Sequence, residues 1–255
     1  NIFKWHSLVS SRVKGWLMRL FKFIVVLFCF NLTACTHSSS PTKVVASDPN
    51  SAGIYRLAKS GIDEDVEIHQ HIVMNHLKRL MTKLYKRNPS IRHDKQFRTI
   101  DDSVELVFSK AHDYEYSQWR DISATDLVSA ALKPEFKGQD RILAFIVGLR
   151  KMLMASYDNH TEFYYLTSID QQKLYNSARN IEVAAWLLAE SKNEHGQHYL
   201  LSDSLENERR NLSYQRLFGQ MIATQDNLAT IVSHKTGRLI KTVVVKAASL
   251  VFIPI

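Results

Sequence analysis

Histidine and carboxylate side chains gather between Glu67 and His76, where metal binding is the first chemistry to consider. His69 and His76 are separated by two helical turns, so on a helix they point within about 20° of one another. The zinc signature His-Glu-x-x-His, which needs two histidines one turn apart, is absent. We expect a solvated helix edge and no cofactor here, and metal binding through His69 and His76 stays an alternative.

Other catalytic patterns are sparse in this chain. Asp158, Asn159 and His160 follow an apolar segment and could supply half of a catalytic set, although Asp and Asn more often end a helix. The sequence contains no Gly-x-Ser-x-Gly, phosphate-binding loop or dinucleotide fingerprint. We predict a protein that is not an enzyme. The alternative is an envelope enzyme acting on peptidoglycan or lipid with dispersed catalytic residues.

Three aromatic residues, Tyr114, Tyr116 and Trp119, lie close together in a segment that resembles a loop. Exposed aromatic side chains could bind a sugar chain such as peptidoglycan, or a protein partner. In a helical protein, however, such residues often pack a loop onto the core. Both interpretations remain open at this point, and the three residues form a possible binding surface.

The C-terminal segment from Leu239 to Ile255 combines valine-rich apolar runs with basic residues that include Lys241 and Lys246. It could lie on an anionic membrane as a basic amphipathic element, or it could bind a partner. The interpretation that we favour is a last helix or strand that completes the core.

The net charge of +8 does not indicate nucleic-acid binding, because of where the charges lie. Five basic residues and no acidic residue precede Cys35, which leaves 28 basic against 25 acidic residues, or about +3, for the rest. A polyanion partner therefore has little support, and we expect no nucleic acid among the partners.

The chain has two cysteines, Cys29 and Cys35, and both lie in or directly after an apolar run from Phe23 to Phe30. The run is too short to span a bilayer, which takes about 20 residues, but it has the length of a signal-peptide core and follows basic residues. It closes with Leu32, Thr33, Ala34 and Cys35. This ending resembles the bacterial lipobox, with Leu at −3, a small residue at −1 and the obligatory Cys at +1.

The lipobox resemblance implies a diacylglycerol on the sulfur of Cys35, cleavage before it and acylation of the new amino group. Membrane lipid would then be one partner, through acylated Cys35, and an envelope protein or peptidoglycan could be another. Thr36 stands where many Gram-negative lipoproteins retained in the inner membrane have Asp. By that rule the protein would go to the outer membrane, with its body facing the periplasm.

The sequence is therefore divided into four parts. We expect an upstream extension at 1–17 (with Met18 as the true start), a lipoprotein signal peptide at 18–34, the lipidated Cys and a flexible tether at 35–52, and a helical domain at 53–255. Apolar spacing and capping signals predict one all-α domain of about six or seven helices. The expected elements are a helix over 62–87; a short element at 104–108 that is a helix begun by Asp101 or a strand; a helix begun by Ser123; a central helix over 139–157; a helix begun by a capping box at Ser168 and running to about Ser191; and a helix over 205–232 ended by Gly237.

Overall fold

The computed structural model describes residues 61–164, 168–205, 208–242 and 251–255, and this part of the chain is helical. It contains six α-helices and one short 3₁₀ turn, and its only β-pairing is an isolated bridge between Lys192 and His198. The elements are α3 (Gly61–Arg87), α4 (Ile100–Phe108), η1 (Ser117–Trp119), α5 (Ala124–Ala130), α6 (Arg141–Ser156), α7 (Gln171–Glu190) and α8 (Ser213–Thr236). The predicted all-α class is confirmed. Within the described ranges, no helix is both long and apolar enough to cross a membrane.

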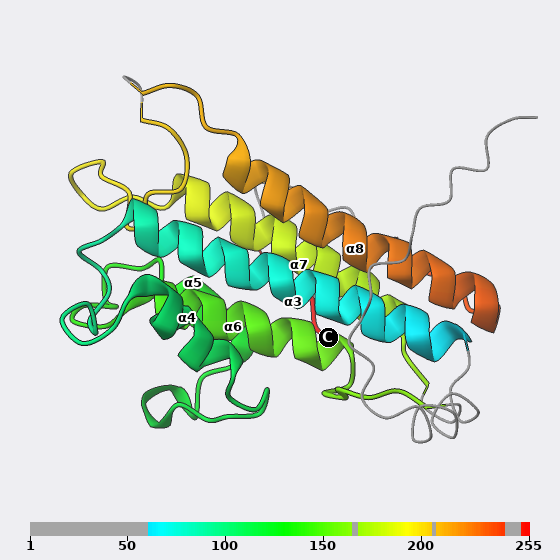
Figure 1. The fold of residues 1–255 in the computed structure, drawn as a ribbon. Helices are drawn as coiled ribbons and strands as arrows, with labels where there is room; N and C mark the ends of the chain where they lie inside the picture. Colours follow the sequence, from blue (N-terminus) through cyan, green and yellow to red (C-terminus); the bar gives the residue numbers. More distant parts are fainter. Residues whose placement is uncertain (1–60, 165–167, 206–207, 243–250) are drawn as a thin grey trace, which may run out of the picture. The chain divides into compact units, whose positions relative to one another are not determined.

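Three long helices and the shorter α6 form the body of the domain. Helices α3 and α7 both pack against α8, and α6 contacts α3, α5 and α7 (Figure 1). Ile142, Phe145, Ile146, Leu149 and Leu153 of α6 are at most 1% exposed, so the segment predicted as the central helix does lie in the core. Helix α4 lies against α3 and is a helix rather than the alternative strand.

Gly148 sets how closely α5 and α6 approach. A Cβ atom at this position would lie 2.7 Å from the backbone oxygen of Ala124 and 2.7 Å from a methyl carbon of Val128. Only glycine allows this contact without moving one of the two helices. The short α5 is thereby held directly on the central helix.

Two of the predicted helix starts need correction. Thr99, not Asp101, begins α4: its hydroxyl accepts a hydrogen bond from the backbone N of Asp102 at 3.1 Å, and the Asp102 carboxylate accepts one from the Thr99 backbone N. Likewise Asp170, not Ser168, begins α7, because its carboxylate accepts from Gln172 N at 2.7 Å. In each case the cap side chain that reaches a free N–H of the first turn sits two residues from the predicted one.

Other predicted boundaries are confirmed by the backbone. Ser123 caps α5 by accepting a hydrogen bond from Asp126 N at 3.1 Å. Gly237 ends α8 in the left-handed conformation, with φ 67°. Asp158 and Asn159 also have positive φ, so they end the central helix as short polar residues can.

Helix α8 was predicted over 205–232, but it covers 213–236. The residues before it fold back on themselves instead: the Ser204 hydroxyl donates to Arg209 O at 2.8 Å, and the backbone N of Asn211 donates to that hydroxyl. Arg87, at the end of α3, pairs with Glu208 in the same segment. These bonds compete with helix formation, and α8 starts only after them.

The last described residues lie against α7. The side-chain amide of Asn180 donates to Ile253 O at 2.8 Å and accepts from Ile253 N at 2.7 Å, as a strand neighbour would. Phe252 and Ile255 are half-buried against the core, whereas Leu239 and Val251 are 89% and 68% exposed. The described part of the C-terminal segment thus joins the core only in part, and 243–250 lie outside the described residues.

Candidate functional site

A cavity of about 430 Å³ opens between the C-terminal half of α3, helix α4, the loop that carries η1 and the start of α6. Its lining mixes aromatic, cationic and acidic side chains with a few aliphatic ones. The residues are Tyr85, His93, Asp94, Arg98, Ser103, Leu106, Val107, Lys110, Tyr116, Gln118, Trp119, Gly138, Gln139, Asp140 and Leu143. A ligand pocket of small-molecule size typically has this volume and composition.

Two members of the predicted aromatic cluster, Tyr116 and Trp119, line the cavity, and Tyr114 lies beside them with its ring centre 5.0 Å from that of Tyr116. Tyr114 is 44% exposed, Tyr116 is half-buried, and Trp119 is only 2% exposed. The Trp119 indole N–H donates to the side-chain oxygen of Gln139 at 2.8 Å, which fixes the ring against the turn before α6. Trp119 is therefore a core residue with one face on the cavity, and only the two tyrosines present accessible aromatic surface.

A cation lies above the two tyrosine rings. The Lys110 ammonium is 3.8 Å from the ring centre of Tyr114 and 4.8 Å from that of Tyr116, within the range of cation–π attraction. Arg150 of α6 donates to the backbone oxygens of Val107 and Lys110, each at 2.8 Å, and so fixes the start of this loop. Arg150, which belongs to the central helix, therefore fixes the backbone at Lys110, and Lys110 in turn contacts both tyrosine rings.

The Tyr116 hydroxyl is buried and has no hydrogen-bond partner among the described residues. Burial raises the pKa of this phenol, so it stays protonated at neutral pH. An unsatisfied buried hydroxyl costs about 1–3 kcal/mol.

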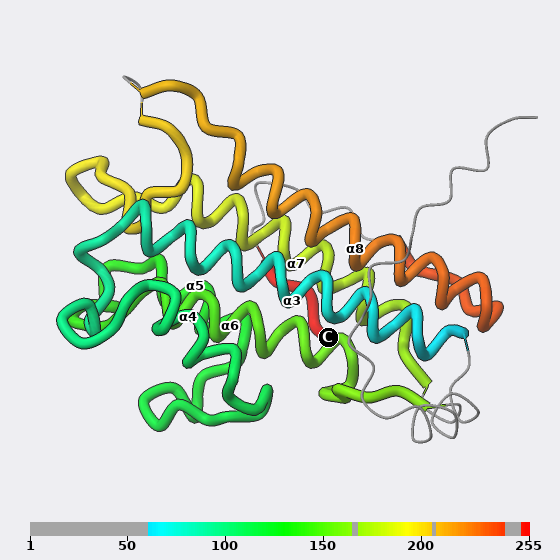
Figure 2. Tube along the Cα trace, viewed as in Figure 1, coloured from blue at the N-terminus to red at the C-terminus, as the bar shows by residue number. Residues whose placement is uncertain are grey.

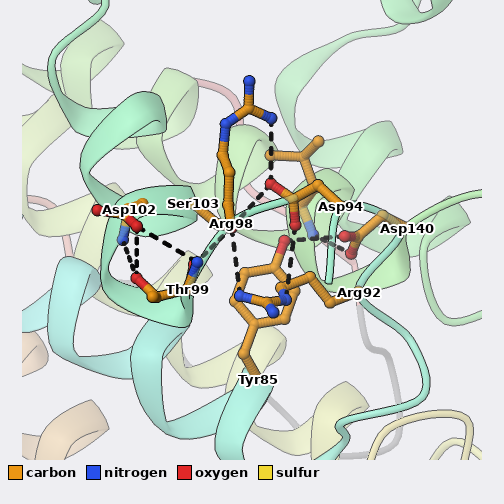
Figure 3. Close-up of polar contacts among 9 residues, drawn as sticks. Tyr85, Arg92, Asp94, Arg98, Thr99, Asp102, Ser103 and Asp140 are labelled. Atoms are coloured by element: carbon orange, nitrogen blue, oxygen red, sulfur yellow. Dashed lines mark hydrogen bonds and ion pairs between the residues drawn. The ribbon is translucent and has the colours of Figure 1, made fainter. Parts of the chain in front are cut away.

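Asp140 lies at the back of the cavity, where both of its carboxylate oxygens are engaged. One accepts from Leu143 N at 2.9 Å, as the cap of α6, and the other accepts from the Tyr85 hydroxyl at 2.8 Å (Figure 3). Burial raises the pKa of Asp140, and the hydrogen bonds from Leu143 and Tyr85 oppose that rise. Burial, together with the Asp140 charge, also raises the pKa of Tyr85. The pair stabilises the start of α6, and each carboxylate oxygen of Asp140 accepts one hydrogen bond.

Asp94 is the second acidic group, and cations surround it. It accepts from the Ser103 hydroxyl at 2.7 Å and forms ion pairs with Arg92 and Arg98, each at 3.5 Å (Figure 3). The Arg92 side chain is almost buried, whereas that of Arg98 is 47% exposed. Arg98 can therefore turn from Asp94 toward a ligand with little loss, since exposed ion pairs are weak.

With Lys110 and Arg98 among its lining residues, Asp140 hydrogen-bonded through both oxygens and Asp94 paired with two arginines, the cavity favours anionic or polar ligands over cations. The aromatic edge adds a surface on which an apolar ring face can stack.

The two histidines of the metal alternative lie elsewhere, on α3. His69 shares a hydrogen bond with Asp65 O through its ring Nδ1 at 2.7 Å. Burial lowers the pKa of His76, and the positive charges of Arg79 and Arg216 lower it further. Within the described ranges, no three side chains of metal-ligand type converge.

The remaining predicted site residues do not join the cavity. The backbone N and O of Lys241 bond to the side chain of Gln172, at 2.7 and 3.0 Å, in the first turn of α7. Lys246 lies outside the described residues, as do the predicted lipidation site Cys35 and the lipobox residues Leu32, Thr33 and Ala34.

No protein-family model, curated protein or solved structure matches this chain.

Proposed function

We propose that this chain is a lipid-anchored protein of the bacterial outer membrane whose helical body binds another envelope component through the cavity beside Tyr116. The observation that carries the binding function is the aromatic and cationic edge: Lys110 over the rings of Tyr114 and Tyr116, at the mouth of a 430 Å³ cavity. The sequence Leu32–Cys35 after a basic and apolar segment supports the anchor.

The ligand class that suits this edge is a glycan carrying carboxylates, as peptidoglycan fragments do. A sugar ring can stack on the tyrosine faces, and its carboxylate can meet Lys110 and Arg98. The unsatisfied Tyr116 hydroxyl would donate to a ligand oxygen. Each part of the edge then has a counterpart in one ligand.

Binding is better supported than catalysis at this site. Hydrolysis of a glycan usually needs two carboxylic groups free to act as acid and as base or nucleophile. Asp140 caps α6 and holds Tyr85, while Asp94 is held by Ser103 and two arginines. The envelope-enzyme alternative would use Asp94, whose Oδ1 accepts no hydrogen bond from the described residues and lies 3.5 Å from Arg92, or would require Asp140 to leave its partners.

Binding can be measured by titrating the full chain with soluble peptidoglycan fragments. Lys110→Gln and Tyr114→Ala alter exposed parts of the edge, and we expect each to weaken binding at least about fivefold, since an aromatic or charge-assisted contact contributes roughly 1–3 kcal/mol. Lys137→Gln removes a matched exposed lysine outside the cavity and should leave affinity unchanged.

Equal affinities for all three variants would reject the site. If the wild-type chain cleaves the fragments, the enzyme alternative replaces the binding function. If it binds no fragment, crosslinking and pull-down from intact envelopes, with the same variants as controls, tests whether a protein occupies the edge instead.

The anchor can be tested with the two cysteines of the chain. Because only a Cys at +1 of the lipobox accepts diacylglycerol, we expect Cys35→Ser to abolish incorporation of a labelled fatty acid and to leave an unprocessed precursor. Cys29→Ser is the matched control and should keep the label. Undiminished labelling of Cys35→Ser would reject the lipoprotein assignment.

The metal alternative has its own measurement. Elemental analysis showing about one zinc or copper ion per chain, lost when both His69 and His76 are replaced, would support a metal-binding lipoprotein in place of a glycan-binding one.

A further inference from the structure

A row of basic side chains runs along the C-terminal half of α3. His76, Arg79, Lys83 and Lys86 are spaced so that, at about 100° per residue, they fall within roughly 80° of one another around the helix. Arg216 of α8 lies close enough to His76 and Lys83 to influence the pKa of both. We call these five residues the basic face.

The packing of α3 against α8 brings the two halves of the basic face together. The Lys83 ammonium donates to the Ser213 hydroxyl at 2.6 Å and lies 4.6 Å from the ring centre of Tyr214. The Tyr214 hydroxyl in turn donates to the backbone oxygen of Lys83 at 2.9 Å. The end of α3 is therefore held beside the start of α8, and the two helices run antiparallel side by side (Figure 2).

The charges of the basic face are not balanced by nearby acids. Among the described residues, Arg79, Lys86 and Arg216 have no carboxylate within 4.0 Å. Burial lowers the pKa of Lys83, and Arg79, Arg216 and Lys86 lower it further, as expected where like charges crowd.

Two of the described acidic side chains near this end of α3 have partners outside the basic face. Glu208 pairs with Arg87, and Asp203 accepts a hydrogen bond from Gln215. Lys78, on the flank of α3 that faces α4, pairs with Glu105. These ion pairs and hydrogen bonds leave the positive charges of the basic face without a nearby acidic partner among the described residues.

Exposed apolar side chains accompany the basic face. Ile72 is one turn before His76 and is 38% exposed, and Leu212 is one turn before Arg216 and is 55% exposed. Basic residues mixed with exposed aliphatic ones are typical of surfaces that rest on lipid headgroups, with the aliphatic groups inserted between them.

We propose that the basic face docks onto the anionic headgroups of the membrane that holds the chain. The inference rests on the proposed lipid anchor, which places a membrane within reach. Gly61 follows Cys35 by 26 residues, so even a fully extended chain keeps the start of α3 within about 90 Å of the lipid. Docking would hold the body in one orientation, with the α3–α8 face on the membrane. The flank that carries the cavity would then face away from the membrane.

The test measures how readily exposed lysines of the full chain react with an amine-specific label in reconstituted vesicles. Lys86 reports on the basic face, and the exposed Lys137, between α5 and α6, is the control within the same molecule. With phosphatidylglycerol present, we expect labelling of Lys86 to fall about fivefold relative to pure phosphatidylcholine, the fold-change that corresponds to one basic residue at an anionic surface. Labelling of Lys137 should not change, and 1 M salt, with a Debye length of about 3 Å, should restore labelling of Lys86.

Two charge-matched double variants sharpen the result. Arg79→Glu with Arg216→Glu should abolish the protection of Lys86, while Lys133→Glu with Lys151→Glu should preserve it. Circular dichroism confirms that each variant is folded before labelling.

Equal labelling of Lys86 in the two lipid compositions overturns the proposal, as does loss of protection in both double variants. Protection by duplex DNA at phosphate concentrations where vesicles give none would also overturn it and assign the face to nucleic acid. The fatty-acid label on Cys35 distinguishes the anchor hypothesis from the docking hypothesis. A labelled Cys35 with an unprotected Lys86 rejects docking and keeps the anchor, whereas a protected Lys86 without a labelled Cys35 rejects the anchor and keeps docking.

Discussion

Three helices of the core are joined by a buried polar network centred on Gln225 of α8. The Tyr157 hydroxyl, after α6, donates to the Gln225 side-chain oxygen at 2.5 Å. The Gln225 amide nitrogen donates to the hydroxyls of Ser177 on α7, at 2.6 Å, and of Ser156 on α6, at 3.1 Å. All four residues are 0% exposed, so water cannot replace a lost partner.

The free energy of the Tyr157–Gln225 bond can be isolated with a double-mutant cycle. Tyr157→Phe leaves the Gln225 oxygen without its donor, and Gln225→Leu leaves the Tyr157 hydroxyl without its acceptor. An unsatisfied buried polar group costs about 1–3 kcal/mol, so each variant should lose that much free energy of unfolding. The double variant leaves neither atom of the pair unsatisfied. Its loss should therefore be smaller than the sum of the single losses by about 0.5–3 kcal/mol.

Urea unfolding followed by circular dichroism measures these differences. Unchanged slopes with shifted midpoints would show that stability, rather than the denatured state, has changed. Tyr114→Phe, at an exposed tyrosine, is the control and should stay within about 0.5 kcal/mol of the wild type. If the double variant loses the full sum of the single losses, or if each single loss is below 0.5 kcal/mol, the network does not couple the three helices.

The remaining predictions concern other parts of the same core. Gly148→Ala should destabilise the protein by about 1–3 kcal/mol in the same urea assay, because its methyl group would meet the Ala124 oxygen at 2.7 Å. Gly219→Ala, in a helix with no atom within 4 Å of the new methyl, should stabilise the protein by about 0.4–1 kcal/mol. If Gly148→Ala proved more stable than Gly219→Ala, the close approach of α5 and α6 would be contradicted. Asn180→Ala should speed hydrogen exchange of the Ile253 amide, which donates to the Asn180 side chain, and unchanged exchange would show that α7 does not hold it. Burial raises the pKa of Tyr157, so the folded state keeps a proton that the unfolded chain releases above about pH 10. Stability should therefore be complete below that pH and fall above it, with a shallower fall in Tyr157→Phe.

Much of the fold could be predicted from local signals in the sequence. The central helix could be placed because its apolar residues recur at helical spacing over 142–153, and all of the residues that carry that pattern are buried. Ser123 and Gly237 marked a helix start and a helix end for reasons that act within one turn. Local chemistry of this kind does not depend on the rest of the chain.

The misplaced boundaries have a different origin. Near Asp101 and Ser168 several short polar side chains follow one another, and which of them reaches a free N–H depends on where the chain enters the helix. The start of α8 was placed too early because Arg87, far away in the sequence, pairs with Glu208. A contact over such a separation leaves no periodic signal.

The candidate site could be predicted only at its aromatic edge. The sequence predicted that Tyr114, Tyr116 and Trp119 either form a binding surface or pack a loop onto the core, but it did not indicate that Trp119 alone would be buried, with its indole N–H bonded to Gln139. The polar part of the cavity was missed, because its residues come from separate parts of the chain that α3, α4 and α6 bring together. The charged stretch at 92–98 between two helices was the one signal that could have drawn attention to it.

The two proposed surfaces lie on different flanks of the same helix, and this arrangement bears on how they could work together. Tyr85 of α3 lines the cavity on the side of α4 and α6, whereas Arg79 and Lys83 belong to the side of α8. Tyr85 and Arg79 are six residues apart, which turns them about 120° from each other around the helix axis. If the body rests on lipid through the α8 side of α3, as we propose, the cavity therefore stays open to solvent. A bound glycan and a docked membrane could then be held at once, because neither needs the side chains that the other uses.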